Sequence, residues 1–253
     1  MSSAEGQGAP AGPARLVRLQ GPDELARRAA EEVARLAVAA VEARGAFSVA
    51  LSGGSTPRLL YRLLADPAEP FLRRVPWPQV HVFFGDERGV PPDDPASNFR
   101  MAREALLDRV PAGSVHRMEA ELGAPEAATR YQAALQDHFG SAEAPVLDLA
   151  LLGLGTDGHT ASLFPGSPAL RERRRWVVAA SGPPPAVERI TLTPPLFERA
   201  RSLLFLVAGA DKAEPLRRLL RARPGEDPIP AAQLRPAGEV LVLADRAAAA
   251  QVG

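Results

Sequence analysis

Cysteine is absent from the 253-residue sequence, and lysine nearly so. The lack of thiols excludes disulfides, cysteine nucleophiles and every metal site that depends on cysteine ligands. Lys212 is the only lysine, and arginine carries the rest of the positive charge. Because arginine stands at every other basic position, the one retained lysine is a candidate functional residue.

An excess of charge is also missing, since 30 basic residues balance 30 acidic residues. The sequence has no broad basic field that would indicate binding to nucleic acid or to an anionic membrane surface. No uninterrupted apolar stretch approaches the roughly 20 residues that a membrane-spanning helix needs. We therefore expect a soluble, cytoplasmic protein whose attraction for an anion is built into one local site.

What is present is the composition of a globular protein with a substantial core, 46% apolar and 24% charged. Residues 1–14 lack an apolar signal core, and we expect them to form a disordered N-terminal lead. Residues 15–253 contain no internal repeat and no strong interdomain linker. We expect them to form a single domain.

Short apolar runs alternate with longer helical patterns along residues 15–253. Near-continuous apolar strands separated by helices are typical of a mostly parallel sheet covered on both faces. The pattern predicts an α/β fold, a single-domain Rossmann-like α/β/α sandwich. Strands are expected at residues 16–19, 47–51, 80–84, 147–152, 176–180, 203–207 and 239–243, and helices at 22–43, 57–64, 97–107, 125–139 and 213–220.

Ligands bind beyond the carboxyl ends of the strands in such a fold, and the first unusual loop there is SGGSTP. Gly53 and Gly54 permit a tight turn and a close backbone approach to a ligand. Ser55 or Thr56 is expected to cap the next helix, with Pro57 in its first turn. Free amides at a helix start suit a phosphate. An ordinary strand-to-helix turn is the alternative interpretation of the same residues. The loop is neither a Walker loop nor a dinucleotide fingerprint, because both spacings fail.

The second loop places three consecutive charges after the strand VHVFF. Such charges are costly unless they are solvated or paired. Arg88 can hold a phosphate or carboxylate through its planar fork. Asp86 or Glu87 can orient hydroxyls or water, and the segment continues to Asn98, a further candidate for substrate binding. The alternative is a solvated loop with an internal ion pair.

The third loop, GLGTDGHTASLFP, follows the strand LDLALL. Asp157 and His159 are separated by one residue and surrounded by glycines, including Gly155, so both side chains can face one cleft. Histidine titrates near neutrality and can take a proton from water and return it. Asp157 can orient the imidazole or a substrate hydroxyl. The loop position favours function over structure for His159 but not for the other histidines, His81, His116 and His138.

The fourth region supplies positive charge from two segments, ERITLT and GADK. Lys212 lies at the start of an expected helix, where the helix dipole disfavours a cation. A bound anion would offset that penalty. Arg189 is a second candidate, with an ion pair to its neighbour Glu188 as the alternative.

Together these loops resemble the 6-phosphogluconolactonase family. The resemblance rests on five blocks in family order, LSGGSTPRLLY, VHVFFGDERGVPPDDPASNFRMAREALL, LDLALLGLGTDGHTASLFPGSP, ERITLTPPLFERA and FLVAGADKAEPL. It implies a sugar-phosphate isomerase-like fold in which residues 15–253 form the lactonase catalytic domain. It also implies hydrolysis of 6-phospho-D-glucono-1,5-lactone to 6-phosphogluconate in the oxidative pentose phosphate pathway, with neither a metal nor a nucleotide cofactor.

By position, the resemblance implies that His159 is the catalytic base, with Asp157 as its neighbour in the motif. Arg88 matches the arginine of the DER loop, and Arg189 and Lys212 match basic positions near the phosphate. Arg58 departs from the family, which commonly has lysine after GGSTP. Charge is preserved there and geometry is not. Arg58 is a further predicted contact with the substrate.

These residues predict a mechanism. The Gly53–Thr56 backbone, Arg189 and Lys212 anchor the phosphate, which fixes the lactone ring. His159 then removes a proton from water, and Arg88 or loop amides stabilise the oxyanion.

Two other functions fit parts of the pattern. A glucosamine-6-phosphate deaminase shares the GG turn and the DGH segment, but HTASLFP and GDERGVP resemble the lactonase. A sugar-phosphate sensor would usually carry a DNA-binding domain. We expect the partner to be a phosphorylated sugar lactone, and the protein to be a monomer or small homo-oligomer.

Overall fold

A computed structural model describes residues 14–140, 143–185, 187–221, 226–234 and 236–253. The expected lead at residues 1–14 lies outside these ranges except for its last residue, Ala14. No helix among the described residues is long and apolar enough to cross a membrane.

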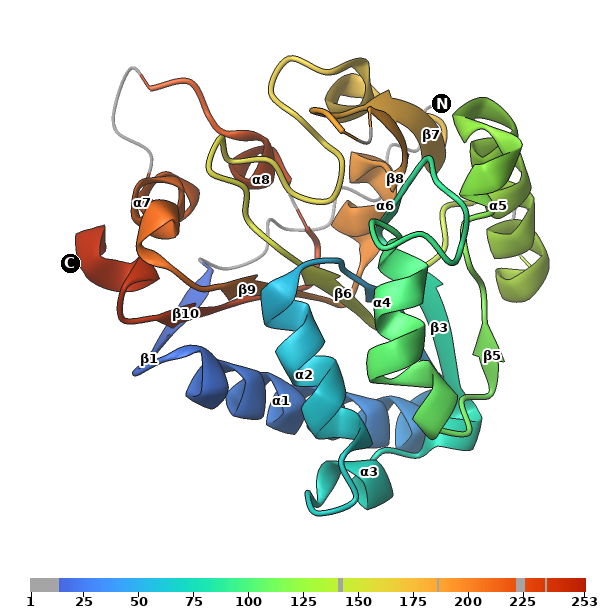
Figure 1. The fold of residues 1–253 in the computed structure, drawn as a ribbon, viewed down its shortest axis with the longest axis horizontal. Coiled ribbons are helices and arrows are strands. Elements are labelled where there is room, and N and C mark those ends of the chain that lie inside the picture. Colours follow the sequence, from blue (N-terminus) through green and yellow to red (C-terminus); the bar gives the residue numbers. More distant parts are fainter. Residues whose placement is uncertain (1–13, 141–142, 186, 222–225, 235) are drawn as a thin grey trace, which may run out of the picture.

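Seven strands form one sheet in which every neighbouring pair is parallel (Figure 1). The three central strands are fully buried and almost entirely apolar, as expected for a sheet covered on both faces. In spatial order the strands are β1 (Arg15–Leu19), β10 (Glu239–Asp245), β9 (Ser202–Val207), β6 (Leu149–Leu152), β2 (Phe47–Leu51), β3 (Val80–Phe84) and β5 (Ser114–Val115).

Helices cover both faces of this sheet. In Figure 1, α1 and α3 lie below the sheet, and α6 and α8 lie above it. The helices are α1 (Pro22–Arg44), α2 (Ser55–Ala65), α3 (Phe71–Arg74), α4 (Asn98–Ala105), α5 (Ala124–Phe139), α6 (Pro194–Arg199), α7 (Ala213–Leu220) and α8 (Pro230–Gln233). Six 3₁₀ helices are η1 (Trp77–Gln79), η2 (Leu107–Arg109), η3 (Ala120–Leu122), η4 (Pro168–Arg171), η5 (Ala210–Lys212) and η6 (Ala248–Gln251) among the described residues.

Helix α1 shows why the local sequence predicts its helix well. Pro22 stands in its first turn, followed by Asp23 and Glu24, which suit the positive end of the helix. The helix ends at Gly45, whose φ of 79° is left-handed and whose N–H donates to the carbonyl of Val41. Its small alanine face packs into the continuous apolar core of the described residues.

The predicted strands and helices are confirmed, with ends that shift by up to two residues. The α/β prediction with a mostly parallel sheet is confirmed as well. One detail was wrong: neither Ser55 nor Thr56 caps α2, because the helix already begins at Ser55 and its N-cap is Gly54. The division into one catalytic domain stays a prediction.

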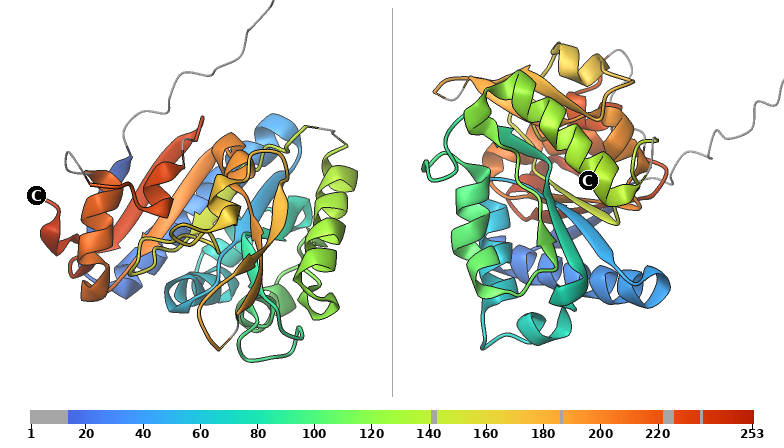
Figure 2. Two further views of the ribbon diagram at one scale, coloured as in Figure 1. Left: turned by 90° about the horizontal axis from the view of Figure 1, so that it is seen from above. Right: turned by 90° about the vertical axis from the view of Figure 1, so that its right-hand side faces the viewer.

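A second, three-stranded antiparallel sheet is the main feature that the sequence did not reveal. Its order is β4 (Asp86–Arg88), β8 (Glu188–Leu192) and β7 (Val177–Ser181). The expected strand at 176–180 forms, but in this small sheet. Figure 2 shows α5 beside the small sheet, and α5 contacts both β7 and β8.

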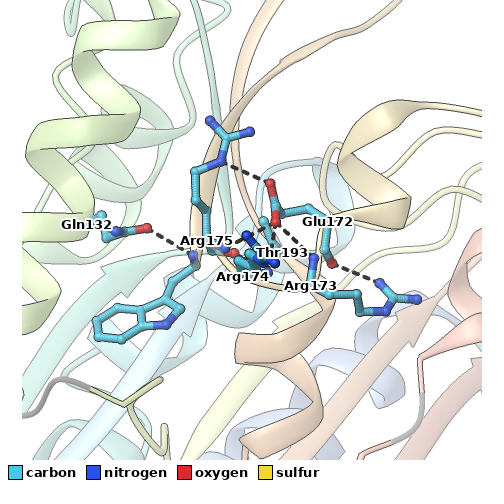
Figure 3. Close-up of polar contacts among 7 residues, drawn as sticks. Gln132, Glu172, Arg173, Arg174, Arg175 and Thr193 are labelled. Carbon is cyan, nitrogen blue, oxygen red and sulfur yellow. Dashed lines mark hydrogen bonds and ion pairs between the residues drawn. The ribbon is translucent and has the colours of Figure 1, made fainter.

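A tight turn fixes the chain where it enters β7 (Figure 3). The carboxylate of Glu172 accepts hydrogen bonds from the backbone N–H groups of the next three residues, at 2.8–3.2 Å, and from Nε of Arg175 at 2.9 Å. Thr193 Oγ1 donates to the carbonyl of Arg175, and the N–H of Trp176 donates to Oε1 of Gln132. The turn therefore joins the small sheet to α5 and to the start of α6.

Candidate functional site

A cavity of about 400 Å³ opens at the carboxyl ends of β2, β6 and β9. This is where the strand order reverses, because the chain proceeds from β2 to β3 on one side and from β6 to β9 on the other. Open parallel sheets bind ligands at such a reversal. Eleven of the fourteen predicted site residues line the cavity, namely Gly53, Gly54, Ser55, Thr56, Asp86, Arg88, Asn98, Gly155, His159, Arg189 and Lys212.

His159 is held at the cavity wall by its own loop. Its Nδ1 lies 2.6 Å from Oδ1 of Asp157, which also accepts the backbone N–H of His159 at 3.1 Å. The carboxylate places the proton on Nδ1 and leaves Nε2 as the basic nitrogen. Burial raises the pKa of Asp157, but the hydrogen bonds from the backbone and ring of His159 outweigh it, so the net pKa is lowered. Asp157 itself does not line the cavity and acts through His159.

Gly155 lies under this pair because no larger residue fits there. A Cβ on Gly155 would lie 2.1 Å from Nδ1 of His159 and 2.7 Å from Oδ1 of Asp157. The N–H of Gly155 also donates to the carbonyl of His159 at 2.8 Å. On the other side the ring of Phe164 lies 4.6 Å from the imidazole, centroid to centroid, and also lines the cavity.

Two arginines face each other across the small sheet. Arg88 on β4 and Arg189 on β8 are direct partners in the antiparallel register, and both line the cavity. The Nε atoms of both are buried and have no hydrogen-bond partner among the described residues. Burial lowers the pKa of Arg189, and the neighbouring charge of Arg88 adds to the effect. Two half-buried like charges, each with an unused Nε donor, form a site suited to an anion.

Asn98 connects this arginine pair to the loop after β2. Its Oδ1 accepts from a terminal nitrogen of Arg88 at 2.5 Å, and its Nδ2 donates to the carbonyl and the carboxylate of Asp86. Gly53 is glycine because a Cβ there would lie 1.8 Å from Oδ1 of Asn98. These contacts pack the starts of α2 and α4 against each other.

Ser162 is a site residue that sequence reasoning missed. Its hydroxyl is fully buried and donates to Oδ2 of Asp86 at 2.7 Å. Ser162 also lines the cavity. The only sequence signal was its place three residues after His159, which does not distinguish it from its neighbours.

Lys212 lines the cavity from the segment that follows β9, at the N-cap of α7. Its Nζ lies 3.0 Å from Oδ2 of Asp211, so the ammonium is already paired at the cavity rim. The ion pair between Arg189 and Glu188, the alternative interpretation of Arg189, does not form among the described residues. Lys212, Arg88 and Arg189 therefore bring three cationic side chains to one cavity.

The substrate-binding role predicted for Glu87 does not fit its position. Its side chain is 2% exposed, and its carboxylate accepts from the backbone N–H groups of Arg88, Asn98 and Phe99 and from Oγ of Ser97. Burial raises the pKa of Glu87, although these hydrogen bonds oppose the shift. Glu87 secures the start of α4 instead of facing the cavity.

Arg58 also lies elsewhere. It points from α2 into a separate cavity beside α4, and it is absent from the lining of the cavity that contains His159. The expected contact of Arg58 with the substrate therefore does not fit its position.

No group of three or more histidine and acidic residues that could hold a metal ion occurs in the described part of the chain.

Residues 20–243 match the family model described as glucosamine-6-phosphate isomerases/6-phosphogluconolactonase. The chain belongs to this family. A 6-phosphogluconolactonase from Nostoc is 43% identical over 220 residues, which cover 84% of this chain and 88% of the relative. The resemblance to the 6-phosphogluconolactonase family in the five sequence blocks is thus confirmed.

Solved structures of the glucosamine-6-phosphate isomerase/6-phosphogluconolactonase family share the fold. The 6-phosphogluconolactonase from Trypanosoma cruzi superposes with a TM-score of 0.85 at 32% identity, covering 98% of this chain and 99% of that chain. A monomeric glucosamine-6-phosphate deaminase superposes with a TM-score of 0.75 at 23% identity, over 94% of this chain and 99% of that one. The second likeness concerns the fold alone.

Proposed function

We propose that this protein hydrolyses 6-phospho-D-glucono-1,5-lactone to 6-phospho-D-gluconate, with His159 as the general base. The observation that carries the proposal is the pair of Asp157 and His159, joined at 2.6 Å, at the wall of a cavity with three cationic side chains. A poised imidazole and a separate anion site suit a phosphorylated ester. Relatives that match most of the chain are named for this activity.

The phosphate anchor combines backbone and side-chain donors. Gly53 and Gly54 lead into α2, and Ser55 and Thr56 in its first turn line the cavity at the positive end of the helix. Arg189 supplies a half-buried guanidinium with an unused Nε, and Lys212 supplies a point charge. Anchoring the phosphate at a distance from C1 turns binding energy into orientation of the lactone carbonyl.

The reaction then needs one proton carrier. Nε2 of His159 takes a proton from water while the water oxygen bonds to C1, and the carbonyl oxygen becomes an oxyanion. Arg88 stabilises that oxyanion. The imidazolium, stabilised by Asp157, gives its proton to the ring oxygen as the C1–O bond breaks and the oxyanion re-forms the carbonyl. The product is a free acid that loses its proton to solvent.

Replacing His159 by alanine tests the base. We expect kcat to fall by about 10²–10⁴-fold, because general acid–base help is of that size. Hydrolysis is followed as acid release above the spontaneous background, and circular dichroism verifies the fold. Turnover close to that of the unaltered protein would eliminate His159 as the base.

Replacing Lys212 by alanine tests the anchor. The loss of one hydrogen bond to a charged group is expected to raise KM about tenfold, with a smaller effect on kcat. An unphosphorylated gluconolactone serves as the matched substrate and should be unaffected. An equal effect on both lactones would remove Lys212 from the phosphate site.

The same preparations separate this function from the related deaminase activity. Ammonia release from glucosamine 6-phosphate, without lactone hydrolysis, would assign the chain to that reaction.

We further propose a cytoplasmic location, which cell fractionation tests. We also propose a monomer or small homo-oligomer, which size-exclusion chromatography with light scattering tests.

A further inference from the structure

A second cavity, of about 600 Å³, lies between α2 and α4 and shares no lining residue with the substrate cavity. The two helices pack together and stand side by side at the front of Figure 1. Four arginines line it: Arg58 and Arg62 from α2, Arg100 from α4, and Arg109 from η2. Nothing in the proposed hydrolysis uses them.

Most of this positive charge is uncompensated. Arg100 pairs with Glu104 at 2.7 Å and donates to the carbonyl of Asp93. By contrast, Arg58, Arg62 and Arg109 make no ion pair or side-chain hydrogen bond with any described residue. Glu104 and Asp66 are the carboxylates of the wall, so the lining carries four positive and two negative charges.

The unpartnered arginines are arranged at a cost to the helix. Arg58 and Arg62 are four residues apart and therefore neighbours on one face of α2, where like charges destabilise a helix. A bound anion would remove this repulsion. Guanidinium forks match phosphate oxygens in geometry as well as charge. Apolar side chains, including Met101 and Pro95, complete the wall and can contact an organic group.

We propose that this cavity binds a small anion with two or more phosphate groups, such as a nucleoside polyphosphate, and acts as an effector site. Four guanidinium groups in one hollow of an otherwise neutral protein exceed what a single phosphate needs. Binding at this cavity does not rest on the proposed hydrolysis, whereas the effector role does, because it is measured as a change in KM for the substrate.

The position of the cavity explains how its ligand affects the substrate site. Helix α2 starts at the glycine turn of the substrate cavity, and α4 starts at Asn98 in the same cavity. Gly53 and Asn98 are packed so closely that a Cβ on the glycine would clash. A ligand that bridges Arg62 on α2 and Arg109 beyond α4 therefore restrains both helix starts together, which changes KM for the substrate.

Calorimetric titration with tripolyphosphate, and separately with ATP free of magnesium, tests the site. We expect saturable binding with one site per chain in the Arg189→Ala/Lys212→Ala variant, in which the substrate cavity has lost two cations. The Arg62→Ala/Arg109→Ala variant should bind at least tenfold more weakly. Tighter binding of ATP than of tripolyphosphate would show that the apolar wall contacts the organic group.

The matched control removes the same charge elsewhere. Arg73 and Arg74 are exposed on α3 and line neither cavity, so Arg73→Ala/Arg74→Ala should bind both probes as the unaltered protein does. No saturable binding, or an equal loss in this control, would overturn the site. A KM that ignores tripolyphosphate while binding occurs would overturn the effector role.

Discussion

At the scale of single residues, geometry favours one of two roles proposed for Asp157. The sequence allowed it to orient the imidazole or to contact a substrate hydroxyl. Its carboxylate engages both the backbone N–H and the ring of His159, and its side chain lies outside the cavity lining. A spacing of two residues in a loop does not fix side-chain directions, so the sequence alone could not separate the two roles.

Replacing Asp157 by asparagine tests this orienting role. We expect kcat to fall about 10- to 100-fold, because the neutral amide no longer stabilises the imidazolium. KM should change little.

Asp137→Asn provides the control, because Asp137 is exposed on α5 and outside the cavity. An Asp157→Asn variant with an unchanged kcat and a raised KM would instead indicate that Asp157 contacts the substrate.

At the scale of elements, strand β4 explains why the sequence found the charged loop but misassigned one of its members. Side chains alternate along a strand, so Asp86 and Arg88 face the cavity while Glu87 faces the start of α4. Three consecutive charged residues do not predict a strand, and the loop interpretation therefore placed all three side chains in the site. The apolar strands were predicted well because a continuous run of apolar residues indicates a buried strand.

The structural role of Glu87 predicts a loss of stability. Glu87→Ala would leave three backbone N–H groups and the Ser97 hydroxyl without their acceptor. We expect the free energy of unfolding to fall by about 3 kcal/mol. Glu87→Gln keeps one acceptor oxygen and should lose about half as much.

Urea unfolding followed by circular dichroism measures both Glu87 variants. Activity is recorded well below the midpoint, to separate stability from catalysis. A stable Glu87→Ala protein with a raised KM would return Glu87 to the substrate site.

At the scale of the whole molecule, three of the four histidines gather far from the cavity, around the edge of the large sheet. The ring of His138 lies 4.6 Å from that of His81 and 5.0 Å from that of His116, centroid to centroid, and His116 stacks on Phe83. Ser114 is hydrogen-bonded to both His81 and His116. Burial lowers the pKa of His116, and burial with the neighbouring histidines lowers that of His138.

This histidine cluster predicts how the fold responds to acid. Because the folded pKa values of His116 and His138 lie below the usual 6.5, the unfolded chain binds more protons as the pH falls. Their contribution to stability is complete above pH 6.5 and is lost as the pH falls through the folded pKa values. Glu172 affects stability at lower pH, because the backbone N–H of Arg174 and the other donors lower its pKa to about 2. Its contribution is lost only from about pH 4.5 downwards.

Urea midpoints at pH 7, 6, 5 and 4 distinguish these two sources of pH dependence. We expect the midpoint of the unaltered protein to fall between pH 7 and 5, and the fall to be shallower in His116→Gln/His138→Gln. Glu172→Gln should be less stable by about 1–2 kcal/mol at pH 7, through weaker hydrogen bonds, yet keep the same slope between pH 7 and 5. An equally steep fall in the histidine variant would mean that groups other than His116 and His138 govern the pH dependence in this range.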